Sequence, residues 1–205
     1  MDMTEALNLA DYRRSVAALY AQVRAHDDPE AARAHWLAVR NVLFSSHASS
    51  PIAAPDRAAW SGLRAFAYDP SWRLEVAVRP VDGDQPPVGI AHSADGATTA
   101  RAIGRVTIEH RDTSADLTVY WLDQYGGGLF LPFRDATGGD ATYGGGRYLL
   151  DGAKSADLGG TEGRLVLDFN FAYHPSCAHD SRWSCPLAPP ANHLPMAVEA
   201  GERLT

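Results

Sequence analysis

Residues 117–133 read LTVYWLDQYGGGLFLPF, and this stretch decides the fold class. Two short apolar runs, 117–122 and 129–133, lie on either side of the sequence DQYGGG. Glycine reaches the positive φ angles of tight hairpin turns without steric strain, whereas other residues rarely do. The stretch therefore predicts two antiparallel strands joined by a hairpin.

Further strands are expected on both sides of this hairpin. From Trp72 to Val78, apolar residues alternate with charged residues, which is the period of a half-buried strand. The other candidate strands are residues 102–110, 146–150, 165–169 and 196–200. Short turns with Gly, Asp or Pro separate them, and no strand–helix–strand alternation is visible. We therefore predict a mainly β fold of the α+β class, an antiparallel β-barrel or sandwich.

The N-terminal part of the chain has a helical period instead. Residues 9 to about 26 place their apolar side chains on one stripe. A second helix is expected to begin after Asp28, because Asp is a favourable N-cap and Pro29 suits the first helical position. The chain is therefore interpreted as a single domain, residues 1–205, with a helical hairpin (about 9–46), a loop (about 47–70) and a β domain (about 71–205).

Composition limits the classes of partner. The chain of 205 residues has a formal net charge of −7 and 18 Lys and Arg residues that do not cluster. A nucleic-acid groove needs clustered positive charge to replace the counterions of the phosphates, so we expect no nucleic-acid partner. No secretory leader and no apolar run of about 18–20 residues is visible, so we expect a cytoplasmic protein without a membrane partner.

The C-terminal segment, residues 168–202, has no helical or strand period over most of its length. It nevertheless holds both cysteines, three of the eight histidines and many aromatic and apolar residues. Long irregular segments of this kind in a small domain are usually functional or packed down as a cover. We expect this segment to wrap across one end of the β domain and to return as a last strand.

Residues 133–149 read FRDATGGDATYGGGRYL, and residues 167–202 read LDFNFAYHPSCAHDSRWSCPLAPPANHLPMAVEAGE. These motifs resemble the double signature of a prokaryotic family known as domain of unknown function sixteen eighty-four. The run SSPIAAPDRAAWSGLRAFAYDP (residues 49–70) is also similar to that family, so the resemblance covers about residues 36–202. His174 stands where the family pattern has Asn, and His179 where an aromatic residue is common. The resemblance implies membership of a family without a described activity.

Polar, aromatic and thiol side chains of these motifs are the candidate ligand-binding residues. They are Arg134, Asp135, Tyr143, Arg147, Asp168, Asn170, Tyr173, Cys177, Cys185, Asn192 and Glu202. The glycines before Arg147 allow backbone N–H groups to face an anion that an arginine would clamp, although a tight turn or bulge before the strand is the favoured explanation. Our first hypothesis is a small-molecule-binding β domain whose pocket is closed by the segment of Cys and Pro residues.

The second hypothesis is an enzyme, a hydrolase or lyase. Asp135, Asp168 and Glu202 offer carboxylates for acid–base chemistry, but local turns and ion pairs explain buried acids as well. A cysteine nucleophile paired with His174 or His179 is conceivable, although nearness in sequence is poor support for a dyad. The sequence leaves open whether the protein is an enzyme.

The third hypothesis is a metal-stabilised structural module. Cys177, His179, Cys185 and His193 have the spacing C-x-H-x5-C-x7-H, which differs from the short Cys and His pairs of zinc sites. We therefore assign no metal ligands and no cofactor. Buried reduced thiols are favoured over a disulfide, because the cytoplasm keeps thiols reduced.

Overall fold

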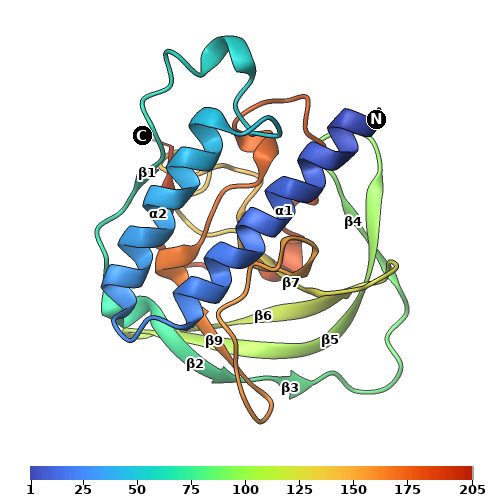
Figure 1. Cartoon of the computed structure of the whole chain (residues 1–205). Coiled ribbons are helices and arrows are strands. Elements are labelled where there is room, and N and C mark those ends of the chain that lie inside the picture. Colours follow the sequence, from blue (N-terminus) through green and yellow to red (C-terminus); the bar gives the residue numbers. More distant parts are fainter. Residues whose placement is uncertain (205) are drawn as a thin grey trace.

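The computed structural model describes residues 1–204 and shows a helical hairpin followed by a strand-rich region (Figure 1). Helix α1 spans Met3–Arg24 and helix α2 spans Pro29–Ser46. The strands are β1 (Arg64–Ala65), β2 (Arg73–Ala77), β3 (Arg79–Pro80), β4 (Val88–Ala91), β5 (Ala97–His110), β6 (Thr113–Leu122), β7 (Leu129–Phe133), β8 (Arg147–Asp151), β9 (Arg164–Asp168) and β10 (Glu202–Arg203).

Both helices begin at side-chain caps. Helix α2 has the predicted start: Asp28 accepts from the N–H groups of Glu30 and Ala31, and Pro29 opens the helix. Helix α1 begins earlier than its apolar stripe indicated. Asp2 and Glu5 form a capping box there, in which each side chain accepts from the backbone N–H of the other residue at 2.8 Å.

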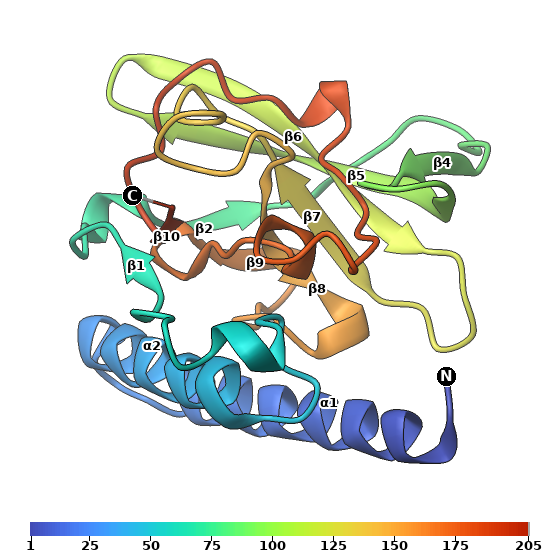
Figure 2. The ribbon, with the colours of Figure 1, turned by 90° about the horizontal axis from the view of Figure 1, so that it is seen from above.

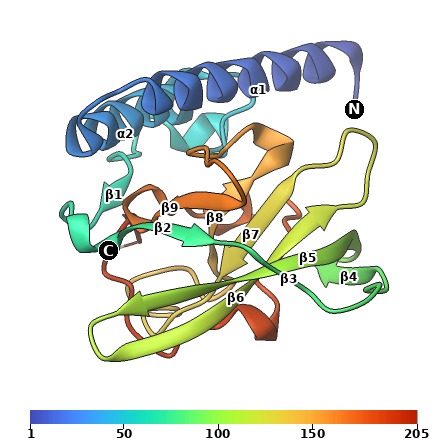
Figure 3. The same ribbon diagram turned by 90° about the horizontal axis from the view of Figure 1, so that it is seen from below.

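The strands pair antiparallel in every named ladder, which confirms the predicted fold class. One sheet has the order β3-β5-β6-β7-β8, with β4 also pairing with β5, and the pairs β2–β9 and β1–β10 are separate. This arrangement is a sandwich and not a closed barrel. The helical hairpin covers one side, the long β5 and β6 lie on the far side, and β2, β8 and β9 lie between them (Figures 2 and 3).

The hairpin of residues 117–133 is confirmed. Strands β6 and β7 pair through Tyr120 with Phe130 and Trp121 with Leu129. Gly126, Gly127 and Gly128 all have positive φ. The turn therefore has the backbone geometry that its consecutive glycines predicted.

Two hydrophobic cores hold the layers together. The core between the helices and the sheet includes Tyr12, Val16, Tyr20, Trp36, Tyr120, Phe130, Tyr148, Phe171 and Tyr173. The core between the two sheet layers includes Trp72, Val106, Ile108, Leu117, Phe133, Leu167, Phe169 and Val198. Burial of apolar area at both interfaces is the main force that stabilises the fold.

The predicted strand at residues 196–200 is wrong. This segment is irregular, and the last strand is the two-residue β10. Its backbone groups bond to buried side chains instead of a neighbouring strand: the Val198 N–H donates to Asp135 Oδ2 at 2.8 Å, and Arg147 donates to the Val198 and Ala200 carbonyl oxygens. Strand β4, which the sequence reasoning missed, pairs with the first half of β5.

Substitution of Gly201 by alanine is expected to destabilise the protein strongly. Gly201 has φ +78°, and an added Cβ would lie 2.5 Å from the Ala172 carbonyl oxygen and 2.6 Å from that of Phe169. Gly139 is the matched control, because it has φ +89° but no atom within 4 Å of such a Cβ. The clash should make Gly201→Ala less stable than Gly139→Ala by about 1–3 kcal/mol in urea unfolding. Equal unfolding midpoints would contradict the close packing of this turn.

Candidate functional site

The first group of candidate residues is a buried network around Arg147, whose side chain is 1% exposed. Its guanidinium donates to Asp135 Oδ1 at 3.2 Å, to the Val198 carbonyl oxygen at 2.8 Å, and to the carbonyl oxygens of Ala200 and Glu202. Asp135 also accepts from the N–H and hydroxyl of Thr137. These bonds fasten the C-terminal segment to β8. The glycines before Arg147 form a turn, and the arginine side chain after it points into the interior.

A second group ties the irregular segment to the sheets. Asn192 is fully buried and bonds to both backbone groups of Thr118 and to the Pro132 carbonyl oxygen. Asp168 accepts twice from Asn170, which in turn bonds to both backbone groups of Asp69. These amides and carboxylates satisfy backbone groups that lack a strand partner, which is a structural task.

Glu202 lies at the centre of a third buried group. One carboxylate oxygen accepts from Arg40 Nη2 at 2.6 Å and Nε at 2.9 Å, and the other accepts from the His174 N–H at 2.9 Å. The Arg40 guanidinium also lies over the rings of Trp36 and Tyr173, at 4.7 and 4.8 Å. Burial would raise the pKa of Glu202, but the charge of Arg40 together with smaller contributions from His174 and His179 lowers it overall, so the carboxylate is ionised.

The His174 ring is neutral in this environment. Burial lowers its pKa to about 3, despite the nearby Glu202 carboxylate. Its Nε2 accepts from the Tyr143 N–H at 3.2 Å, which places the proton on Nδ1, 3.8 Å from Glu202. A base with so low a pKa takes up protons poorly at neutral pH, so the group has little support as an acid–base dyad.

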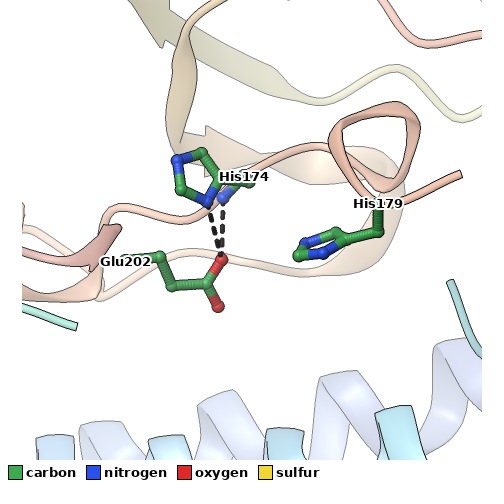
Figure 4. A group of neighbouring side chains, drawn as sticks. All are labelled: His174, His179 and Glu202. Carbon is green, nitrogen blue, oxygen red and sulfur yellow. Dashed lines mark hydrogen bonds and ion pairs between the residues drawn. The ribbon is translucent and has the colours of Figure 1, made fainter. Parts of the chain in front are cut away.

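Within residues 1–204, His174, His179 and Glu202 form a cluster of side chains of the types that bind metals (Figure 4). Their ligand atoms lie within 4.8 Å of one another. The donor set does not fit a metal ion. Both His174 nitrogens are committed, since Nε2 accepts a backbone hydrogen bond and Nδ1 carries the proton. Arg40 occupies the carboxylate and adds a positive charge. The set considered from the sequence does not form such a cluster within residues 1–204: it consists of Cys177, His179, Cys185 and His193.

A cavity of about 290 Å³ lies where the first half of α1 overhangs the sheet. Leu9 and Tyr12 of α1 form one wall, and Leu122, Phe130 and Tyr148 of the sheet form another. The stretch Trp183 to Pro186 of the C-terminal segment closes the side. Of the candidate residues, Cys185 borders this cavity.

Lys154, the only lysine of the chain, lies in the wall of this cavity. Its ammonium donates to Asp151 Oδ2 at 2.8 Å, and the same oxygen accepts from the Tyr173 hydroxyl at 2.9 Å. Burial opposes the charge, but Asp151 outweighs it and raises the pKa of Lys154. The sequence analysis missed Lys154 and Asp151, and the only signal for them is that Lys154 is the single lysine of the chain.

A smaller chamber of about 10 Å³ lies behind the cavity and shares Tyr12, Lys154 and Ser176 with it. Arg40, Tyr173 and His174 line this chamber, and about one water molecule would fill it. Tyr20 also lines this chamber, and its hydroxyl has no hydrogen-bond partner among the described residues. The chamber and the cavity therefore share part of their walls.

Comparison with known proteins identifies the family. A model of the family described as "Protein of unknown function (DUF1684)" matches residues 58–203. The chain belongs to this family. The predicted resemblance is confirmed, and no curated protein matches the chain.

One solved structure resembles this DUF1684 chain along most of its length. It is the solution NMR structure of the uncharacterized protein from gene locus rrnAC0354 of Haloarcula marismortui. The two are 35% identical with a TM-score of 0.60, and the match covers 82% of this chain and 90% of that one. The DUF1684 match begins at residue 58, so the family region supplies the sheet wall and Lys154, and α1 lies outside it. Within residues 1–204, neither helix is long and apolar enough to cross a membrane.

Proposed function

We propose that the protein is a cytoplasmic small-molecule-binding protein that holds a small carboxylate with an apolar body in the cavity beneath α1. The observation that carries the proposal is the Lys154 ammonium in the wall of a mainly apolar cavity. Ligand sites are typically concave and apolar with a few convergent polar groups, and the smallest have volumes of about 300 Å³. The cavity volume of about 290 Å³ suits a small ligand.

The charge of Lys154 supports an anionic head group. An ammonium has three N–H donors, and the structure assigns one of them to Asp151. The side chain is 30% exposed and lines the cavity, and its other two N–H donors are those that would meet an anion. Because its pKa is raised, Lys154 stays protonated at neutral pH and acts as an anion partner instead of a nucleophile.

The walls support an apolar body. Leu9, Leu122 and Phe130 contribute aliphatic and aromatic surface, and Trp183 and Pro186 add to it from the C-terminal segment. Removal of apolar ligand surface from water contributes about 25 cal/mol per Å². Tyr12 lines both the cavity and the smaller chamber, and its hydroxyl is the donor that we assign to the second oxygen of a carboxylate.

Binding can be tested with benzoate and hexanoate as probes, and with benzyl alcohol and hexanol as uncharged analogues. Isothermal titration calorimetry of the unmodified protein measures binding and leaves the single lysine, Lys154, with all of its N–H donors. We expect the carboxylates to give a saturable heat of binding and to raise the unfolding midpoint through mass action. The alcohols should do both more weakly.

Matched variants separate the site from general effects. Lys154→Met should reduce carboxylate affinity roughly 10-fold or more, the usual scale of one charge-assisted hydrogen bond, whereas Lys154→Arg should retain part of it. Arg164→Met, at an exposed position on β9, is the control and should bind as the unaltered protein does. Carboxylate binding that is equal in Lys154→Met and the control would contradict the proposal.

A further inference from the structure

The two cysteines contact each other. Cys177 lies in the short 3-10 turn Ser176–Ala178 and is half-buried, whereas Cys185 is 8% exposed. The Cys177 N–H donates to Cys185 Sγ at 3.3 Å. The side chain of Cys185 therefore contacts the backbone of Cys177 directly.

The intervening loop is fixed in this position. Arg182 donates to the Ser50 carbonyl oxygen at 2.8 Å, and the Trp183 indole donates to that of Pro51 at 3.3 Å. Next to the second cysteine, the Cys185 N–H donates to the Ser93 hydroxyl at 3.1 Å. These anchors hold both ends of the loop in place and keep Cys177 beside Cys185.

The two thiols differ in acidity. Hydrogen bonding with Cys185, aided by Ser93 and Tyr143, lowers the pKa of Cys177 to about 6, although burial opposes this change. The same hydrogen bond and burial raise the pKa of Cys185. The Tyr143 hydroxyl lies 3.8 Å from Cys177 Sγ. Burial is the largest of the causes that raise the pKa of Tyr143 to about 12, so the hydroxyl keeps its proton and remains a donor. A half-buried thiolate therefore lies beside a buried thiol.

We propose that Cys177 and Cys185 form a redox-active dithiol that hydrogen peroxide converts to an intramolecular disulfide. The Cys177 thiolate attacks one peroxide oxygen, the O–O bond breaks, and hydroxide leaves and takes a proton to form water, which leaves Cys177 as a sulfenic acid. Cys185 sulfur then attacks Cys177 sulfur, the S–O bond breaks, and the hydroxyl leaves as water with the Cys185 proton. Both thiols are oxidised, and the peroxide is reduced to two water molecules.

The arrangement assigns different tasks to the two residues. Cys177 is the attacking group because the thiolate is the nucleophile and is accessible to a small oxidant. Cys185 is the resolving group. Once Cys177 is oxidised, its sulfur no longer carries the charge that strengthens the hydrogen bond with Cys185, and that hydrogen bond is the largest cause of the raised pKa of Cys185. Disulfide formation is therefore favoured over further oxidation of Cys177.

Mass spectrometry of the full chain tests the proposal directly. The reduced protein is freed of reductant, treated with one equivalent of hydrogen peroxide, blocked with iodoacetamide and digested with trypsin without reduction. Trypsin cleaves after Arg182, which lies between the cysteines, so peptides 165–182 and 183–203 stay joined only by a disulfide. We expect the joined pair as the main product. Separate peptides with Cys177 as sulfinic acid, or with both thiols unreacted, would overturn the proposal.

Two single variants test the assigned tasks. In Cys185→Ser, peroxide should leave a sulfenic acid on Cys177 that dimedone traps, whereas in Cys177→Ser the remaining thiol should resist peroxide. In the unaltered protein, alkylation of Cys177 should be half-maximal near pH 6. Faster reaction at Cys185 than at Cys177 in the unaltered protein would reverse the assignment, and that measurement requires no variant to fold.

Discussion

Replacing Arg40 by methionine is expected to lower the free energy of unfolding by about 3–5 kcal/mol. Methionine retains much of the apolar contact of the Arg40 stem with Trp36 and Tyr173 but removes the charge. Glu202 is 0% exposed, and it would lose both of its bonds from Arg40. Only the His174 N–H would still bond to the carboxylate, so the charge would be buried without a counterion.

Urea unfolding followed by tryptophan fluorescence measures this effect, with Arg164→Met as the control. Arg164 pairs with Glu75 at 3.1 Å, but both side chains are exposed, so the control should lose less than about 1 kcal/mol. The double variant Arg40→Met/Glu202→Met should recover much of the lost stability, because buried ion pairs replaced by apolar groups cost little. If Arg40→Met were as stable as Arg164→Met, Glu202 would not depend on Arg40.

The hairpins of this fold were predictable because their signals are local. Asp28 and Pro29 determine the start of α2 through bonds within three residues, and Gly126–Gly128 determine the β6–β7 turn through their own φ angles. The alternating burial of β2 likewise follows from neighbouring residues. Such elements depend little on the rest of the chain, so residue types alone indicate them.

The C-terminal segment was not predictable in the same way, because its conformation depends on distant partners. Its backbone bonds to the side chains of Arg147 and Asp135 instead of forming the expected strand at 196–200. Sequence shows that Arg147 and Asn192 are polar, but not that backbone carbonyls will surround them. A residue type that suits a ligand also suits a buried loop, and here the loop explains most of the candidates.

The cavity was hidden from the sequence for a related reason. Its walls come from α1, the sheet and residues 183–186, which are far apart along the chain. Only Cys185 among the predicted site residues lies on it, and Tyr173 lies on the inner chamber. Lys154 had no motif around it. A site built by packing of remote elements leaves no spacing pattern to detect.

His174 should make the protein sensitive to mild acid. Its pKa is about 3 in the folded protein against 6.5 for an ordinary histidine, because the folded environment disfavours the charged ring. The unfolded chain therefore binds a proton that the folded protein does not, and stability is lost as pH falls below about 6.5. The expected loss approaches about 1.4 kcal/mol per pH unit between pH 6.5 and 5. Glu202 adds to the loss only at lower pH, since its lowered pKa lies below 4.5.

The variant His174→Asn isolates this contribution, because an amide keeps hydrogen-bonding groups but does not titrate. Unfolding free energies at about pH 7.5, 6 and 5 should fall less steeply in the variant than in the unaltered protein. The slope that remains should belong to His179, whose pKa burial also lowers. If His174→Asn kept the full slope, the proton that the unfolded chain binds would belong to another group. The assignment of a neutral His174 ring in the folded protein would then be wrong.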